Sequence, residues 1–146
     1  MKKTFILSLC VLAVLAGAAC AEGLRNVDVN SVSGTVQYQK AGQGEWAALS
    51  QGMVLQQTDI VKTGANSTCS LTFKGMSDAV VDVKPDSVME LATVGEAEAG
   101  DQTELGLTLG SVLVKAEKLQ GESSFQVRTP NSIVGIRGTE FEVKVD

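Results

Sequence analysis

The chain of 146 residues contains no histidine. Histidine is the commonest general base near neutral pH, and it belongs to the Ser-His-Asp and Cys-His nucleophilic sites and to the usual catalytic zinc sites. The sequence also has no Gly-x-Ser-x-Gly nucleophile elbow and no phosphate-binding P-loop. We therefore expect a protein that is not an enzyme and that needs no metal or other cofactor.

The remaining acid–base chemistry would be a pair of carboxylates of the glycosidase type. The nominal candidates are Asp82, Asp86, Glu90, Glu140 and Glu142. Asp82 and Glu142 occupy the water-facing phase of alternating runs, and Asp86 follows a proline in an expected turn. Aromatic residues that could stack on a sugar are also scarce, with one Trp, one Tyr and four Phe. We interpret these carboxylates as solvated surface groups.

Basic residues are few, and they do not cluster. Removal of residues 1–21 takes Lys2 and Lys3 from the 12 basic residues and none from the 17 acidic ones, which leaves a net charge of −7. Nucleic-acid binding requires a basic patch that releases counterions from phosphates. The composition therefore argues against nucleic acid as a partner, and it disfavours an anionic membrane surface for the same reason.

The N-terminus has the layout of a secretory signal peptide. Lys2 and Lys3 precede an uncharged run over residues 4–19, which small residues follow. This run of 16 residues is shorter than the roughly 20 that a membrane-spanning helix needs. We expect a signal peptide over 1–21 and a mature domain over 22–146 in the periplasm or cell envelope.

Two processing routes remain open. Ala19 and Ala21 are small residues at the two positions that signal peptidase reads for cleavage before Glu22. Alternatively, Cys20 becomes the lipidated first residue of a lipoprotein, although Gly17 stands where lipoprotein signals carry an aliphatic residue. A lipid at Cys20 would be the one expected attachment to a membrane.

Of the three cysteines, Cys10 and Cys20 lie in or at the edge of the signal peptide. Cys69 is then alone in the mature domain, so no intrachain disulfide is expected. It is in phase with Leu71 and Phe73 in an alternating run, and free cysteine is among the most buried residue types. We predict a small core residue rather than a reactive thiol.

The mature part consists of short β-type runs bounded by Gly, Asn, Asp or Pro, without the apolar spacing of an amphipathic helix. We predict an all-β fold, a compact single domain of short and mainly antiparallel strands that forms a β-sandwich or β-roll. The expected strands are Val32–Gln39, Met53–Val61, Ser67–Phe73, Ala79–Val83, Ser87–Ala92, Glu104–Leu109, Ser111–Ala116, Ser123–Arg128 and Thr139–Val145.

Two segments between these strands have a specific interpretation. The acidic stretch 95–101 lacks large apolar residues and is expected to be a solvated loop; a calcium loop is the alternative, although the regular ligand spacing is missing. Segment 127–141 is expected to be a tight crossover. There Gly135 and Gly138 would adopt conformations that other residues resist, and Arg137 would pair with a carboxylate or cap backbone carbonyls.

An internal similarity links two parts of the chain. Residues 61–67 resemble residues 127–132, and Gly34-Thr35-Val36 resembles Gly110-Ser111-Val112. The offsets are unequal, 66 and 76 residues, which favours two similar β-units in one domain over a strict solenoid. Chance similarity is the alternative.

The aromatic residues of the mature part are expected to anchor the core. Trp46 is the single tryptophan, and it lies between a Gly-rich turn and Leu49. A lone Trp in a small β-protein is usually a core residue, although a partly exposed one serves as a binding hot spot. Tyr38 and Phe125 lie on expected strands, and we interpret them in the same way.

Several spaced motifs run along the mature part of the chain. The most specific is Arg137-Gly138-Thr139-x-Phe141 near the C-terminus. The others are Val32-x-Gly34-x-Val36, Trp46-x-x-Leu49-x-x-Gly52, Asp59-x-Val61-x-Thr63-Gly64-x-x-Ser67, Leu71-x-Phe73, Leu109-Gly110-x-Val112, Phe125-x-Val127-x-Thr129-Pro130 and the Gly135 that precedes the closing element. Together these motifs resemble the FecR-like domain family. The resemblance spans almost the whole mature chain, and we expect a structural role for these motif residues.

The resemblance implies a periplasmic module of a kind that, in the namesake proteins, relays an outer-membrane transport signal through a membrane-spanning regulator. This chain has no cytoplasmic segment before its hydrophobic run, so it looks like a free-standing secreted or lipoprotein member. Because family members often continue beyond the equivalent of Asp146, we expect the sheet to end on an edge that a partner covers. The two expected functions are a protein-interaction or signal-sensing module and a structural or cell-wall-binding envelope protein.

Overall fold

The computed structural model describes residues 26–74, 79–97, 100–116, 123–137 and 139–146. The expected signal peptide over 1–21, with Cys20, and the motif residue Gly138 lie outside these ranges. Within them the chain forms twelve strands and one 3-10 turn, η1 (Lys40–Gly42). The strands are β1 (Val27–Ser33), β2 (Val36–Gln39), β3 (Ala47–Ala48), β4 (Val54–Leu55), β5 (Ile60–Thr63), β6 (Thr68–Phe73), β7 (Ala79–Val83), β8 (Val88–Ala97), β9 (Gly100–Ala116), β10 (Ser124–Arg128), β11 (Ile133–Ile136) and β12 (Thr139–Val145).

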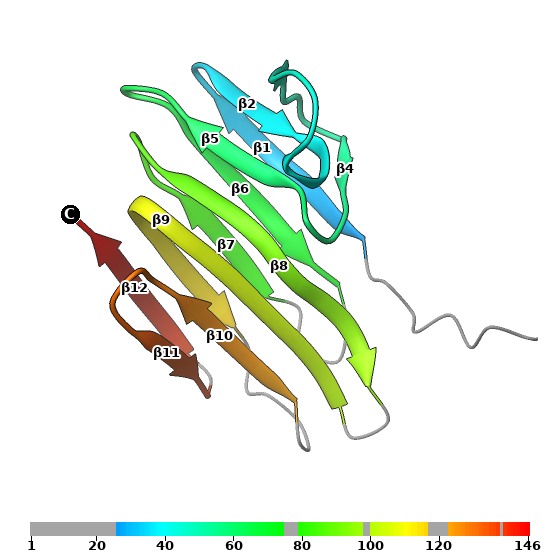
Figure 1. Ribbon diagram of the computed structural model, residues 1–146, viewed down its shortest axis with the longest axis vertical. Helices are drawn as coiled ribbons and strands as arrows, with labels where there is room; N and C mark the ends of the chain where they lie inside the picture. The colour runs from blue at the N-terminus through cyan, green and yellow to red at the C-terminus, as the bar shows by residue number, and fades with distance from the viewer. Residues whose placement is uncertain (1–25, 75–78, 98–99, 117–122, 138) are drawn as a thin grey trace, which may run out of the picture.

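These strands form two layers that share β9 (Figure 1). The first sheet has the order β3-β2-β5-β8-β9-β10-β11, and the second has the order β4-β1-β6-β7-β9-β12. Among the described strands, β9 and β10 form the single parallel pair. The predicted all-β domain of mainly antiparallel strands is therefore confirmed.

At four of the places where the described chain passes from one sheet to the other, it does so through a sharp bend. β1 leads into β2 and β5 into β6, whereas β7 leads into β8, and β9 crosses within one strand. The first half of β9 pairs with β8 as far as Leu109, and its second half pairs with β7 from Val112. Four bent units, whose bends lie side by side, thus form the centre of the domain.

The expected strand boundaries were wrong where the chain bends. The run Val32–Gln39 is divided between β1 and β2 because Gly34 has a φ of 79°. Conversely, the two runs expected on either side of Gly110 form the single strand β9, in which Gly110 has a φ of 87°. The run Met53–Val61 is also divided, between β4 and β5, and Thr58 lies between them with a φ of 74°.

Two expected loops contain strands. Segment 95–101 was expected to be a solvated loop, but Gly95 and Gly100 belong to the paired ends of β8 and β9. The crossover expected over 127–141 begins as a hairpin, since β10 pairs with β11 in the register Phe125 to Ile136. Gly135 lies within β11 and has no positive φ, so the special conformation expected for it was wrong.

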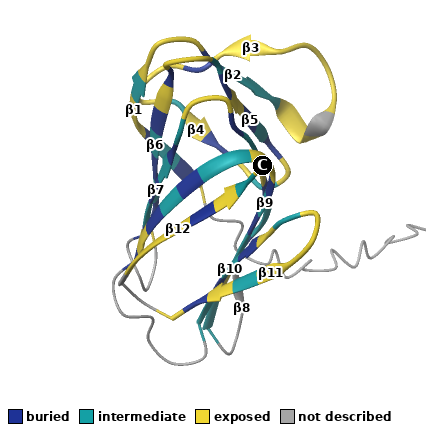
Figure 2. Ribbon diagram, turned by 90° about the vertical axis from the view of Figure 1, so that its left-hand side faces the viewer, coloured by how far each residue is buried: buried dark blue, intermediate teal, exposed yellow. Residues whose placement is uncertain are grey.

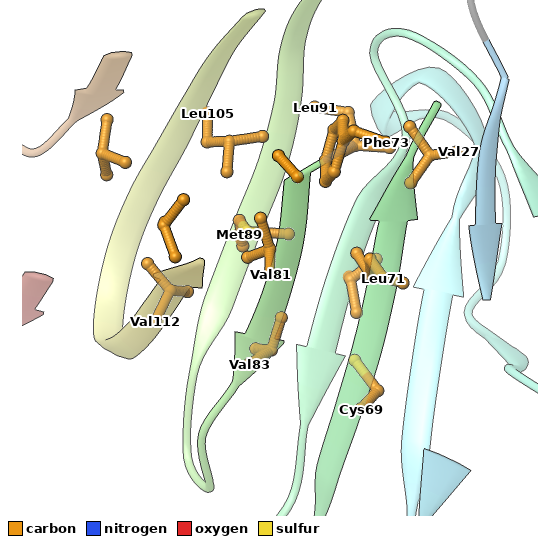
Figure 3. Packing of buried hydrophobic residues seen from close by; sticks show 14 of the residues in the cluster. Val27, Cys69, Leu71, Phe73, Val81, Val83, Met89, Leu91, Leu105 and Val112 are labelled. Carbon is orange, nitrogen blue, oxygen red and sulfur yellow. The ribbon is translucent and has the colours of Figure 1, made fainter. Parts of the chain in front are cut away.

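The core lies between the two sheets and comes from every second residue of the strands (Figure 3). Leu71, Val81, Met89, Leu105 and Val112 are at most 1% exposed. Each such side chain contributes about 1.5–3 kcal/mol through its removal from water. The prediction that Cys69 is a core residue is confirmed, because it is free and buried.

The aromatic residues divide between the core and the surface. Phe125 is 3% exposed, and its ring meets that of Phe73 edge to face at 5.9 Å. Trp46, expected in the core, is 39% exposed, and that expectation was wrong. It lies between η1 and the short edge strand β3, outside the space between the sheets, and Lys62 Nζ lies 5.8 Å from its ring centroid. In the described ranges no helix is long and apolar enough to cross a membrane.

Candidate functional site: the corner seam and the open edge

The four bends form a line of contacts that we call the corner seam, made of Gly34–Thr35, Thr63–Ser67, Lys84–Ser87 and Gly110–Ser111. The same serine–glycine arrangement occurs twice in it. Ser67 Oγ accepts a hydrogen bond from the Thr35 N–H at 2.8 Å and donates to the Ala65 carbonyl at 3.1 Å. Ser87 Oγ accepts from the Ser111 N–H at 3.0 Å and donates to the Pro85 carbonyl at 3.1 Å.

Both glycines of the corner seam leave no room for a side chain. A Cβ atom on Gly34 would lie 2.4 Å from Ser67 Oγ, and one on Gly110 would lie 2.2 Å from Ser87 Oγ. Both residues also have a positive φ, which side chains disfavour. Glycine is therefore needed at both bends for the same two reasons.

The internal similarity of the sequence is half explained by this pairing. Gly34 and Gly110 are structural equivalents, as their similar neighbours indicated. The second half of the similarity, between residues 61–67 and 127–132, was wrong, because residues 127–132 lie in the β10–β11 hairpin. The equivalent of Ser67 is Ser87. In the sequence, the signal that could have identified it is the Asn or Asp that directly precedes each serine. Both of these residues, Asn66 and Asp86, have a positive φ of just over 50° in the structure.

Thr63 and Gly64 connect neighbouring bends within the corner seam. Thr63 is 2% exposed, and its Oγ1 donates to the Lys84 carbonyl at 2.6 Å and accepts from the Ser87 N–H at 2.9 Å. The Gly64 N–H donates to the Thr35 carbonyl at 3.0 Å, and the Gly64 carbonyl accepts from the Asp86 N–H at 3.2 Å. These motif residues satisfy buried polar groups where the ladders of the two sheets are interrupted.

Asp59 is the one buried carboxylate among the described residues, at 4% exposure. Its Oδ1 accepts from the Ala41 N–H at 3.1 Å, and its Oδ2 accepts from the Gln56 N–H at 2.9 Å. Asp59 therefore joins η1 to the turn that precedes β5, and its contacts are to the backbone of its own chain.

The C-terminal motif residues lie apart from the corner seam. Thr129 and Pro130 belong to the turn of the β10–β11 hairpin, where Thr129 Oγ1 accepts from the Ser132 N–H at 3.0 Å. Arg137 follows β11 and is exposed; among the described residues it has no ion-pair partner, so the expected pairing was not found there. Thr139 begins β12, which also carries Phe141.

β11 and β12 are the last strands of their sheets on the same side of the domain, and we call this side the open edge. Figure 2 views it face on. β12 pairs with β9, and no described strand pairs with its other side. An unpaired strand of this kind presents a row of free backbone donors and acceptors. The sheet was expected to end on an edge, and β12 is a strand of this kind.

Apolar surface accompanies the open edge. Phe141 stands opposite the fully buried Val114, so its ring lies on the core-facing side of β12. It is nevertheless 41% exposed, whereas Val143, two residues on, is 5% exposed. Ile133 on β11 is 61% exposed, but it stands opposite the exposed Arg128, on the outer face of the first sheet. The core-facing side of the second sheet is therefore incompletely covered at Phe141, where β12 ends it.

The free backbone groups of β12 can be assigned from the hydrogen-bond alternation. The Lys84 N–H donates to the Ser111 carbonyl at 3.0 Å, so Ser111 and Leu113 direct their backbone groups toward β7. Val112 and Val114 then direct theirs toward β12, where they meet Val143 and Phe141. By the same alternation, the N–H and C=O groups of Glu140, Glu142 and Lys144 point away from the domain.

The five carboxylates named as acid–base candidates do not converge on one site. Asp86 lies in the corner seam, Glu90 lies on the first sheet, and Asp82, Glu140 and Glu142 lie on the second. Asp82 Oδ2 is paired with Lys115 Nζ at 3.2 Å. In the part of the chain that the structure describes, no three His, Cys, Asp or Glu side chains could jointly hold a metal ion.

Cys69 is expected to be inert in the folded protein. Burial, and secondarily the charge of Asp82, raise the pKa of its thiol from 9.0 to about 12. The thiolate is the reactive form, so Ellman's reagent at about pH 8 should leave the folded domain 22–146, which lacks Cys10 and Cys20, unmodified and react only after unfolding in guanidinium. Because the folded pKa is raised, the associated stability is fully present below pH 9.0 and is lost as the pH rises toward 12. Rapid labelling of the folded protein would contradict the assignment.

A polar hollow of about 190 Å³ lies on strands β8, β9 and β10 of the first sheet. The hollow is lined by Thr93, Gln102, Thr103, Glu104, Ser124 and Gln126. The Glu104 carboxylate is paired with the Arg128 guanidinium at 2.7 Å. Hydroxyl, amide and carboxylate groups of this kind form hydrogen bonds with polar ligands, but the lining carries no aromatic ring.

Comparison with protein-family models gives a match over residues 59–146 to the family described as FecR protein. The match covers more than half of the chain, and it extends from Asp59 through β12 to the last residue. Searches of curated proteins and of solved structures found no match.

Proposed function

Because the chain belongs to the FecR protein family, we propose that it is an exported, non-catalytic module of the cell envelope that recognises a protein partner in signal sensing. The family is typically a periplasmic signal-sensing or regulatory module. In this proposal residues 1–21 are the signal peptide, and 22–146 form the working domain. The domain is either free in the periplasm or tethered by a lipid on Cys20.

The observation that carries the proposal is the open edge. β12 offers outward backbone groups at Glu140, Glu142 and Lys144, and Phe141 exposes apolar surface beside them. An extended segment that pairs with such an edge gains main-chain hydrogen bonds, and the neighbouring side chains determine which segment fits. Recognition by strand addition needs no pocket and no catalytic group.

The test is site-directed photo-crosslinking in intact cells. A photoreactive residue at position 144 on β12 should give a reproducible adduct with an envelope protein, because that side chain would lie against the added strand. The matched control is position 68, exposed on β6, a strand paired on both sides. Adducts at neither position, or equal adducts at both, would contradict the proposed use of β12. Intact-mass analysis of the recovered protein distinguishes an N-terminus at Glu22 from a lipidated Cys20.

A second candidate function, binding of peptidoglycan or another cell-wall polysaccharide, is favoured by the polar hollow on the first sheet. In that case the protein should sediment with purified sacculi, and replacement of Gln102 and Gln126 by alanine should reduce the sedimented fraction. A protein that stays in the supernatant would exclude this function.

A further inference from the structure

We propose that β12 pairs with β12 of a second copy of this chain, forming a two-fold symmetric dimer in which the second sheet continues across both molecules. The inference rests on the proposed use of β12 as an interaction edge, and it names the occupant. The argument uses three properties of β12: its free backbone groups, its charge order and its exposed apolar face.

The backbone groups allow an antiparallel pairing about Val143. With a two-fold axis at this residue, Glu142 of one copy stands opposite Lys144 of the other, and the reverse pair forms by symmetry. Glu142 and Lys144 are residues whose N–H and C=O groups point outward. Both symmetric pairs are therefore hydrogen-bonded pairs of the new ladder.

The charges of β12 are self-complementary in this register. Glu142 and Lys144 carry opposite charges and are exposed on the outer face of the sheet. Opposite charges directly across a ladder are favourable, and like charges are unfavourable. The acid pair of this register, Glu140 opposite Asp146, falls at the end of the strand, where Asp146 is already paired with Lys144 of its own chain at 2.9 Å.

An axis through Glu142 is the alternative register. It would place that carboxylate directly opposite its own copy in the middle of the interface, which is unfavourable. The axis through Val143 instead leaves attractive pairs at the centre and moves the like charges to the rim.

The apolar side chains fit the same register. Phe141, which is 41% exposed, would stand opposite the half-buried Val145 of the other copy, and Val143 would meet its own equivalent. These are the pairs without hydrogen bonds, which bring side chains closest together in an antiparallel ladder. A second copy thus covers the core-facing surface that the open edge leaves uncovered.

The dimer should be weak, because one pair of short edge strands buries less than the roughly 1,600 Å² of a standard interface. Sedimentation equilibrium of the processed protein, purified from the envelope fraction, should show a reversible monomer–dimer equilibrium with a Kd in the roughly micromolar range. A protein that is monomeric throughout the accessible concentration range would overturn the inference.

Charge reversal tests the register. Glu142→Lys and Lys144→Glu should each weaken the dimer about tenfold or more, since each change replaces two attractive pairs with two repulsive ones. The double variant restores opposite charges in reversed order and should recover the dimer to within about threefold. Glu140→Lys should tighten the dimer, because it places a lysine opposite Asp146.

Two controls complete the experiment. Glu90→Lys, a matched reversal at an exposed position of β8, should leave the dimer unchanged, and thermal unfolding should show that every variant is folded. A dimer that ignores the β12 reversals, or a double variant that fails to recover, would overturn the inference. A monomer that still gives an envelope-protein adduct at position 144 would overturn the dimer alone. A monomer without that adduct would overturn the proposed function as well.

Discussion

Replacement of Gly110 by alanine is expected to lower the free energy of unfolding by about 2–5 kcal/mol. A positive φ such as the 87° of Gly110 costs an L-residue about 1–2 kcal/mol. The new Cβ would also lie 2.2 Å from Ser87 Oγ, 2.6 Å from Ser87 Cα and 2.7 Å from the Asp86 carbonyl oxygen. Two of these three atoms belong to the backbone, so relief requires a shift of the corner seam, and overpacking of this kind costs about 1–3 kcal/mol more.

Urea denaturation followed by circular dichroism measures this loss. The matched control is Gly44→Ala, because Gly44 has a similar φ of 92° but nothing within 4 Å of its added Cβ. The free energy of unfolding of the control variant should fall only by the cost of the positive φ, about 1–2 kcal/mol. Equal losses in the two variants would show that the close approach of the bends does not limit stability, and the structural assignment of Gly110 would then be wrong.

The second large effect is expected for Thr63→Val, which should lower the free energy of unfolding by about 2–6 kcal/mol. The substitution keeps the shape of the side chain but removes the hydroxyl that donates to the Lys84 carbonyl and accepts from the Ser87 N–H. Each buried group that loses its partner costs about 1–3 kcal/mol. Thr63 is 2% exposed, so solvent does not replace these contacts.

Two further threonine variants separate the hydroxyl from other effects. Thr63→Ser keeps the hydroxyl and loses one methyl group, so it should lose only about 1 kcal/mol. Thr68→Val changes an exposed threonine on β6 and should alter the unfolding free energy by less than about 0.5 kcal/mol. If Thr63→Ser were as destabilising as Thr63→Val, the hydroxyl contacts would not explain the role of this residue.

Five of the motif residues therefore fall into two groups. Gly34, Thr63 and Gly64 contact one another's bends in the corner seam. Thr139 and Phe141 lie on the open edge, where the second sheet ends. We expect the first group to determine the stability of the fold, whereas the second lies where, in the proposed function, a partner would add a strand. Variants of the two groups should consequently separate stability from binding.

Local patterns predicted the strands best where alternation and turn residues agree. Ala79–Val83 and Thr139–Val145 were expected with the bounds that β7 and β12 have. Alternation is a property of neighbouring residues, so it is readable without the fold. The bends were missed because a glycine with positive φ ends a strand at Gly34 but continues one at Gly110. Whether the strand ends or continues at such a glycine depends on the strands that pair with it. The residues around each glycine carry no information about those strands.

Trp46 and the β10–β11 hairpin show the same dependence. A large apolar residue suggests the core, but Trp46 lies beside the short edge strand β3, and the space between the sheets is filled by other residues. Segment 133–136 was expected to cross over, yet it pairs back onto β10. In both cases the competing residues come from distant parts of the chain.

The sequence by itself determined the all-β class, the burial of Cys69, the positions of most strands and the family, because these follow from residue types and their spacing. Only the tertiary structure showed that four bends meet in the corner seam, that Ser67 and Ser87 hold equivalent glycines, and that β11 and β12 end their sheets on the same side of the domain. The physical reason is that hydrogen-bond partners in a β-domain are remote in sequence, so which groups are satisfied, and which remain free for a partner, is decided when the strands assemble.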